Sequence, residues 1–226
     1  MIREELQRTA KLLGEEAVER LSRVKTAVFG LGGVGGHAAE ALVRSGIGAI
    51  DIIDGDTVAL SNINRQLVAL HSTVGRLKTD VCAERFLDIN PDLKLRKFPL
   101  FFGEETADNF DFSEYDFVLD CIDDIAAKVL LAQTCTRLNV KIISSMGAGN
   151  KLNPMGFKLA DIYETSVCPL ARVMRGRLRK AGVERLRVVY STEEPVLTER
   201  TPASCAYVPS AAGLLMASAV IDELTR

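Results

Sequence analysis

The sequence has no two cysteines spaced C-x-x-C, and its five cysteines are an odd number. The spacing gives no support to the commonest zinc pattern, and the odd count gives none to a disulfide framework. With 226 residues, 47% of them hydrophobic, the chain is long enough to form a core without either device. We therefore expect no zinc, and we expect Cys82, Cys121 and Cys135, which lie in apolar segments, to be buried.

The sequence also lacks a long apolar run. Its longest mostly apolar stretch, Pro209 to Ile221, contains Ser and Gly and is shorter than the ~20 residues that cross a bilayer. The segment Met1 to Lys11 is charged and has no hydrophobic signal core. The net charge of −2 shows no overall attraction to nucleic acid, although a local basic patch is compatible with it. These features predict a cytoplasmic protein without membrane contact.

Short apolar segments alternate with helical patterns as far as about residue 145, and no repeat, low-complexity tract or linker interrupts them. Strands are predicted at 26–29, 49–53, 93–98, 116–119 and 140–145, and helices at 34–45, 78–88 and 125–139. This alternation predicts an α/β, Rossmann-like fold with a doubly wound, mostly parallel sheet.

Flanking segments complete the expected architecture. Before the first strand, residues 6–24 have helical spacing that Gly14 breaks in two, and the polar residues 191–204 are expected to form a loop. Further strands are predicted at 156–162 and 186–190, and further helices at 169–181 and 210–224. We expect a single domain over 1–226, with a nucleotide-binding half at 1–145 and a smaller, substrate-side extension at 146–226.

A glycine-rich loop follows the first strand and opens the next helix. Gly30, Gly32 and Gly35 fit G-x-G-x-x-G, and Gly33 lies among them. Glycines let backbone N–H groups at a helix amino terminus approach phosphate closely. Asp54 ends the second strand, where a carboxylate can accept hydrogen bonds from ribose hydroxyls. The pair predicts a nucleotide site, although a nicotinamide-dependent dehydrogenase would show the same features.

Further polar residues favour ATP over a dinucleotide. Arg65 and Lys78 carry charges that can neutralise a triphosphate, and Asp123 is a hard oxygen ligand of the kind that Mg²⁺ takes. Asn62 and Gln66 can hydrogen-bond phosphate or ribose oxygens. Taken alone, Arg65 and Lys78 are equally consistent with solvated surface charges, and Asp120 and Asp123 with caps of the following helix. Two cations and a metal carboxylate together suit attack at a phosphate.

At these residues the sequence resembles the ThiF/MoeB/HesA family of ubiquitin-activating-like adenylyltransferases. The matching motifs are the Gly30–Gly36 loop, Asp54-x-Asp56, Ser61-Asn62-x-x-Arg65-Gln66, Val74-Gly75-x-x-Lys78 and Asp120-x-x-Asp123. The resemblance covers roughly residues 6–150. It implies that Asp54 binds ribose, that Asn62, Arg65 and Lys78 contact phosphates, and that Asp123 binds Mg²⁺. It also implies a homodimer in which Arg8 reaches the ATP of the partner subunit.

The second half resembles the family branch that dehydrates threonylcarbamoyladenosine in tRNA. The motifs are Gly147-Ala148-Gly149-Asn150-Lys151, the stretch Thr165 to Val173, Leu178-Arg179-Lys180 and Val189-Tyr190-Ser191-Thr192-Glu193. The paired zinc cysteines usual in sulfur-carrier activators are absent from the sequence. The resemblance therefore implies that a tRNA carboxylate is adenylated and then closes a ring.

A basic strip agrees with a tRNA substrate. Between residues 172 and 187 only Glu184 opposes seven basic side chains: Arg172, Arg175, Arg177, Arg179, Lys180, Arg185 and Arg187. Such a strip can bind a phosphate backbone, and a solvated helix face is the other interpretation.

Three alternatives stay open at this point. The first is adenylation of the C-terminal glycine of a ubiquitin-like sulfur carrier, with Cys168 or Cys205 available for sulfur or acyl transfer and a sulfur-relay protein as partner. The second is the dehydrogenase, which leaves Arg65, Lys78 and Asp123 unexplained. The third is a nucleotide sensor without turnover. ATP-dependent adenylation is common to the tRNA and carrier-protein hypotheses, and tRNA is the favoured substrate.

Overall fold

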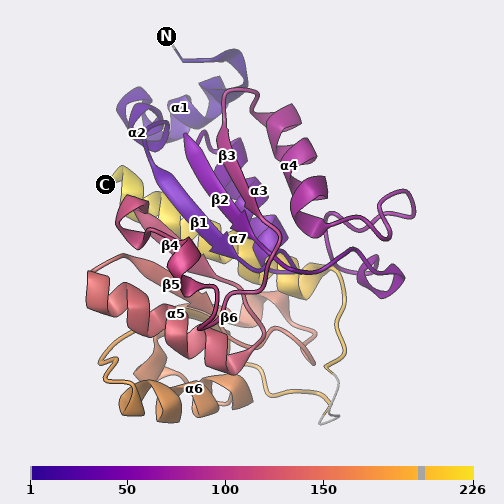
Figure 1. Ribbon diagram of the computed structural model, residues 1–226, viewed down its shortest axis with the longest axis vertical. Coiled ribbons are helices and arrows are strands. Elements are labelled where there is room, and N and C mark those ends of the chain that lie inside the picture. Colours follow the sequence, from indigo (N-terminus) through magenta and orange to yellow (C-terminus); the bar gives the residue numbers. More distant parts are fainter. Residues whose placement is uncertain (1, 198–201) are drawn as a thin grey trace.

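A computed structural model describes residues 2–197 and 202–226 of the chain. Within these residues the strands form one sheet of seven in the order β3-β2-β1-β4-β5-β7-β6 (Figure 1). All neighbours are parallel except β6 and β7, which are antiparallel. The strands are β1 (Lys25–Phe29), β2 (Ala49–Ile53), β3 (Lys94–Phe98), β4 (Phe117–Asp120), β5 (Ile142–Ser145), β6 (Phe157–Asp161) and β7 (Arg187–Ser191).

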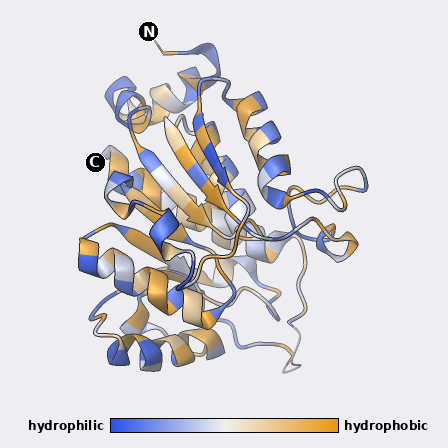
Figure 2. Ribbon diagram, viewed as in Figure 1, coloured by the Kyte–Doolittle hydropathy of each residue, from blue (hydrophilic) through white to orange (hydrophobic). Residues whose placement is uncertain are grey.

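Helices cover both faces of the sheet. The helices α3, α4 and α7 pack with β1 and β2 in one large apolar cluster, and α5 and α6 pack with β5 and β7 in another. Figure 2 shows α6, lowest in the view, alternating between hydrophobic and hydrophilic residues, as expected for a helix with one buried face. The helices are α1 (Gln7–Leu13), α2 (Glu15–Leu21), α3 (Gly35–Arg44), α4 (Lys78–Ile89), α5 (Ile125–Leu138), α6 (Pro169–Lys180) and α7 (Tyr207–Thr225).

The predicted α/β, doubly wound fold is confirmed, and the predicted strands and helices differ from the observed ones by a few residues at their ends. The second half was expected to pack on the sheet as an extension. It is joined more closely than that, because β7 pairs with β5 and continues the same sheet. Residues 198–201 of the predicted loop 191–204 lie outside the described residues.

The helix α7 is longer than its sequence pattern indicated. It has the length and mean hydropathy, 1.2, that a membrane span also has, but 44% of the apolar window is buried in the fold. It packs against α3, where a Cβ on Gly213 would lie 2.3 Å from the carbonyl oxygen of Val34. The core thus accounts for the apolar residues on the buried face of α7.

Burial confirms two of the three cysteines expected in the core. Cys82 and Cys135 are fully buried, and burial raises the pKa of the Cys135 thiol to about 12. Cys121 is only half-buried, because it lies at the carboxyl end of β4 and lines two neighbouring cavities. Cys168, by contrast, is buried at the start of α6.

Candidate functional site

A cavity of about 590 Å³ opens at the carboxyl edge of β1, β2 and β4, the edge where ligands bind in open α/β sheets. Most of the residues predicted for the nucleotide site line it: Gly30, Gly32, Gly33, Asp54, Asp56, Asn62, Arg65, Gln66, Lys78 and Asp123. Gly35 and Arg8 do not. Segments that are up to 93 positions apart in sequence, from Gly30 to Asp123, are therefore brought to one place by the parallel strands.

Glycine is present at different positions of the loop for different structural reasons. A Cβ on Gly35 would lie 1.8 Å from the carbonyl oxygen of Gly30, and a Cβ on Gly30 would lie 2.6 Å from that of Cys121. Close backbone packing therefore requires glycine at both positions. At Gly32 the nearest atom to such a Cβ, Nε2 of Gln66, is 3.8 Å away. The fold does not require Gly32, and the open space beside it fits a ligand that approaches the backbone.

Asp54 fastens this loop to the end of β2. Its carboxylate accepts hydrogen bonds from the backbone N–H of Leu31 at 2.7 Å and from that of Asp56 at 2.8 Å. Burial raises the pKa of Asp54, although the charge of Lys78 and these two N–H groups act in the opposite direction. The carboxylate therefore has a structural task besides any contact with ribose.

Lys78 is a buried cation at the first position of α4. Its Nζ lies 2.7 Å from Oδ2 of Asp56 and 3.8 Å from Oδ2 of Asp54. Its backbone N–H donates to the carbonyl oxygen of Asp56, which fixes the start of the helix against the segment after β2. The ammonium is thus held against two carboxylates at the wall of the cavity, where a phosphate can also reach it.

A short turn after β2 presents Asn62, Arg65 and Gln66 to the cavity. Among the residues that the structure describes, the Arg65 guanidinium donates to two oxygens close in sequence, the Ser61 carbonyl at 3.1 Å and Oδ1 of Asn64 at 2.9 Å. In the part of the chain that is described, Oε1 of buried Gln66 has no hydrogen-bond partner. An orphaned buried acceptor fits a ligand that donates a hydrogen bond, such as a hydroxyl or amino group of a nucleoside.

Asp123 lies in the loop between β4 and α5 and is exposed. The hydrogen-bonding role at the start of α5 belongs to Asp124, whose side chain accepts from the N–H of Ala127 at 2.8 Å. Asp123 is therefore not the helix cap and is available to a cation. Across residues 2–197 and 202–226, no group of three His, Cys, Asp or Glu side chains forms a ready-made metal site. One carboxylate suits a Mg²⁺ that takes its other ligands from phosphate and water.

One wall of the cavity was not predicted from the sequence. Leu100, Phe101 and Phe102 follow β3 and line the cavity beside Ile53 and Ile122. Phe101 is 67% exposed, unusual for so large an apolar side chain. The rule that ligands bind after the carboxyl ends of strands points to this segment when it is applied to β3. An apolar wall of this kind fits a purine base.

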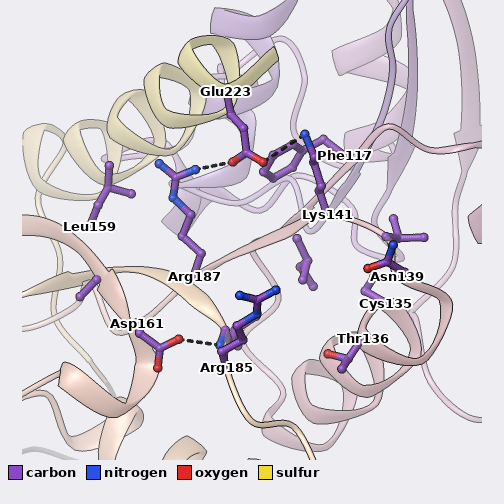
Figure 3. A pocket seen from close by; sticks show the side chains of 14 residues that line it. Phe117, Cys135, Thr136, Asn139, Lys141, Leu159, Asp161, Arg185, Arg187 and Glu223 are labelled. Atoms are coloured by element: carbon purple, nitrogen blue, oxygen red, sulfur yellow. Dashed lines mark hydrogen bonds and ion pairs between the residues drawn. The ribbon is translucent and has the colours of Figure 1, made fainter. Parts of the chain in front are cut away.

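Two other cavities are of similar size: one adjoins the nucleotide cavity, and the other lies at the opposite, amino-terminal edge of the sheet. A second cavity of about 590 Å³ adjoins the first, because Val34, Cys121, Ile122 and Asp123 line both. A third, of about 640 Å³, opens at the amino-terminal edge of β4, β5 and β7. There Glu223 pairs with Lys141 at 3.2 Å and with Arg187 at 2.5 Å, and Figure 3 shows it between them. None of the predicted nucleotide-site residues lies in this third cavity.

Arg8 lies on α1, far along the chain from the loops that form the site, and its side chain is exposed. It does not line the nucleotide cavity of its own chain. The basic strip is partly engaged: Arg175 donates to the Thr165 carbonyl at 3.0 Å, and Arg179 lies 4.9 Å from the ring centre of Tyr163. Arg172, Arg177 and Lys180 are exposed on α6 and have no ion pair with any described residue.

Comparison with known proteins gives concordant results. The family model described as the ThiF family matches residues 5–225. The tRNA threonylcarbamoyladenosine dehydratase of Bacillus subtilis (strain 168) is 40% identical, over 95% of this chain and 92% of the relative. The enzyme of the same name from Escherichia coli (strain K12) is 36% identical over 91% of this chain and 80% of its own length. A crystal structure of the E. coli enzyme in complex with ATP superimposes with a TM-score of 0.92 at 32% identity, covering 98% of this chain and 94% of that one.

Proposed function

The chain belongs to the ThiF family, and from this membership we propose that it uses ATP to dehydrate threonylcarbamoyladenosine in tRNA to its cyclic form. The observation that carries the proposal is one cavity that combines a glycine-rich loop, two cations and an exposed carboxylate, and that adjoins a second cavity able to take the acceptor.

In the first step the substrate carboxylate attacks the α-phosphate of ATP, and pyrophosphate leaves. Lys78, Arg65 and the N–H groups of the loop stabilise the negative charge that builds on the phosphate oxygens. The apolar wall at Leu100 to Phe102 receives the base, and Asp54 and Gln66 face the ribose side. When bound, Mg²⁺ on Asp123 would neutralise phosphate charge.

In the second step a nitrogen of the same modified base attacks the activated carbonyl carbon. The ring closes, the nitrogen loses its proton and AMP leaves with one of the former carboxylate oxygens. Both reacting groups belong to one nucleoside, so proximity supplies most of the rate and no protein nucleophile is needed. This fits Cys168, which is buried in the wall of the second cavity, and Cys205, which does not line either cavity.

The alternative substrate, the C-terminal glycine of a ubiquitin-like sulfur carrier, has less support. The relatives named adenylyltransferase and sulfurtransferase UBA4 match a smaller part of the chain, for example 33% identity over 58% of it in the protein of Candida glabrata. The dehydratases of two bacteria match more than nine-tenths of it. A sulfur-relay or ubiquitin-like protein remains a proposed partner only in this second function.

Four further features belong to the proposal. The chain is a single adenylating domain over 1–226 that acts in the cytoplasm as a homodimer, in which Arg8 of each subunit completes the partner's site. That Arg8 does not line its own cavity supports this role. The exposed basic residues lie on α6, whose first two residues, Pro169 and Leu170, line the second cavity, and this supports a role for them in binding the tRNA backbone.

The experiment incubates purified protein with ATP–Mg²⁺ and tRNA that carries the uncyclised modification. We expect AMP release that depends on this tRNA, and a nucleoside lighter by one water. If no AMP appears with tRNA, pyrophosphate exchange with ubiquitin-like proteins is the next assay, and exchange there would assign the carrier-protein function instead.

A further inference from the structure

The second cavity contains one buried cation that the adenylation site does not use. Lys151 lines this cavity and is 3% exposed. Its neighbours in the lining are mostly apolar, among them Met146, Ala148 and Leu170. Among the described residues of the lining, the one carboxylate is that of Asp123, at the boundary with the nucleotide cavity. A lysine in such surroundings is unusual, because burying an ammonium costs free energy unless a charge compensates it.

The position of Lys151 is set by the residue before it. Asn150 has a left-handed backbone (φ 56°) and is bonded to the segment on the other side of the cavity. Its Oδ1 accepts from the N–H of Ala203 at 2.6 Å, and its Nδ2 donates to the Leu197 carbonyl at 3.0 Å. These bonds hold the loop after β5 against the cavity wall, so Lys151 is fixed by the fold rather than by a flexible tether.

Within residues 2–197 and 202–226 the ammonium has one hydrogen-bond partner, the backbone carbonyl oxygen of Glu193. The carboxylate of Glu193 points elsewhere and accepts from the N–H groups of Leu152 and Asn153, the latter at 2.9 Å. Among the residues that the structure describes, Lys151 forms no ion pair. An ammonium has three donors, so two remain for a ligand. Burial lowers the pKa of Lys151, and nearby negative charge opposes that shift.

We propose that Lys151 binds the free carboxylate of the threonylcarbamoyl group on tRNA and holds it beside the α-phosphate of ATP for adenylation. The proposal rests on the function proposed above and names the group that recognises its substrate. The carboxylate supplies the missing counter-charge, and the apolar walls receive the rest of the modified base. Attack then takes place across the boundary at Asp123, which both cavities share.

The same contact explains discrimination between tRNAs. An unmodified adenosine offers no carboxylate, so its binding gains nothing from Lys151 and leaves the ammonium unpaired. A charge-assisted hydrogen bond of this kind corresponds to about a 10- to 100-fold preference for the modified tRNA. The basic residues of α6, in contrast, contact backbone phosphates and do not distinguish the two tRNAs.

The test measures the dissociation constants of modified and unmodified tRNA, in the presence of a non-hydrolysable ATP analogue, for four proteins. These are the wild type, Lys151→Met, Lys151→Arg and the matched control Lys158→Met, whose lysine is exposed on β6. We expect Lys151→Met to lose the preference for modified tRNA while its affinities for unmodified tRNA and for the analogue stay within about twofold of wild type. Lys151→Arg should keep part of the preference, and Lys158→Met all of it.

An undiminished preference in Lys151→Met would overturn the proposal. If that variant loses nucleotide binding through misfolding, wild-type protein is given tRNA in which the carboxylate is converted to an amide. We expect the amide to bind no better than unmodified tRNA, and equal binding of amide and acid contradicts the proposal. Failure of the proposed function can be distinguished from failure of the Lys151 proposal. If the proposed function is wrong, the wild-type protein will prefer neither tRNA and will release no AMP.

Discussion

The ammonium of Lys128 and the carboxylate of Asp120 form an ion pair with 2.9 Å between Nζ and Oδ2, and neither side chain is exposed to solvent. Lys128 also donates to the carbonyl oxygen of Ile122 at 3.1 Å. Asp120 accepts from the N–H of Ile122 at 3.2 Å. The pair therefore holds the backbone N–H and carbonyl of Ile122, the residue directly before Asp123.

The first prediction concerns this pair. Lys128→Met leaves a buried carboxylate without its counter-charge, and we expect it to lower the free energy of unfolding by about 3–5 kcal/mol. Adding Asp120→Asn removes the unpaired charge and keeps an acceptor for Ile122, so the double variant should recover most of the loss. Urea unfolding of the wild type, Lys128→Met, Asp120→Asn and the double variant measures the coupling. A double variant no more stable than Lys128→Met would show that the charge pair is not the cause.

The second prediction separates two glycines of one loop. Gly32→Ala should fold with wild-type stability and bind ATP at least about tenfold more weakly, because its Cβ enters space that the protein leaves open. Gly35→Ala should instead destabilise the fold, because its Cβ would overlap the carbonyl oxygen of Gly30. Thermal unfolding with and without ATP checks both. Equal loss of stability in the two variants contradicts the different reasons given for the two glycines.

The third prediction concerns the assignment of Arg8 to the partner's site. Arg8→Ala and Lys78→Ala should each lower tRNA-dependent AMP release by about 100- to 1,000-fold, since each removes charge that stabilises the transition state. Mixed and re-equilibrated, the two variants form dimers in which one site has both residues. Random pairing then restores about a quarter of wild-type activity. The control Arg76→Ala, which removes an exposed ion pair with Glu84, should leave activity unchanged. No recovery in the mixture would show that Arg8 does not act across the dimer.

The fourth prediction follows from the raised pKa of Asp54. Because burial raises this pKa, the carboxylate takes up a proton at a higher pH than an exposed aspartate does. Protonation removes an acceptor that binds Leu31 and Asp56 and shapes the loop. The affinity for ATP should therefore fall as the pH is lowered, and the fall should begin at a higher pH than the titration of an exposed aspartate. Asp54→Asn should bind ATP weakly with little dependence on pH, and a wild-type affinity with the same pH dependence as that of Asp54→Asn would contradict the role of Asp54.

The sequence predicted the succession of strands and helices along the chain and most residues that line the nucleotide cavity, because both follow from local patterns. A strand that is followed directly by Gly30 or Asp54 places that residue at the carboxyl edge of the sheet whatever the neighbouring strands are. Burial that depends on contacts between distant segments could not be predicted from local patterns. From the sequence, Lys151 looks like an ordinary lysine in a loop. It becomes a buried cation because the segment around Ala203 packs against Asn150. The half-exposed position of Cys121 has the same origin, since two cavities meet at the end of β4.

The most direct test of the central claim follows one oxygen atom. The modified tRNA is prepared with ¹⁸O in the threonylcarbamoyl carboxylate and incubated with the protein and ATP, and the products are analysed by mass spectrometry. Adenylation of the carboxylate predicts one ¹⁸O in the released AMP and none in pyrophosphate, together with the dehydrated nucleoside. Dehydrated tRNA accompanied by unlabelled AMP, or by label in phosphate or pyrophosphate, would contradict dehydration through an acyl-adenylate.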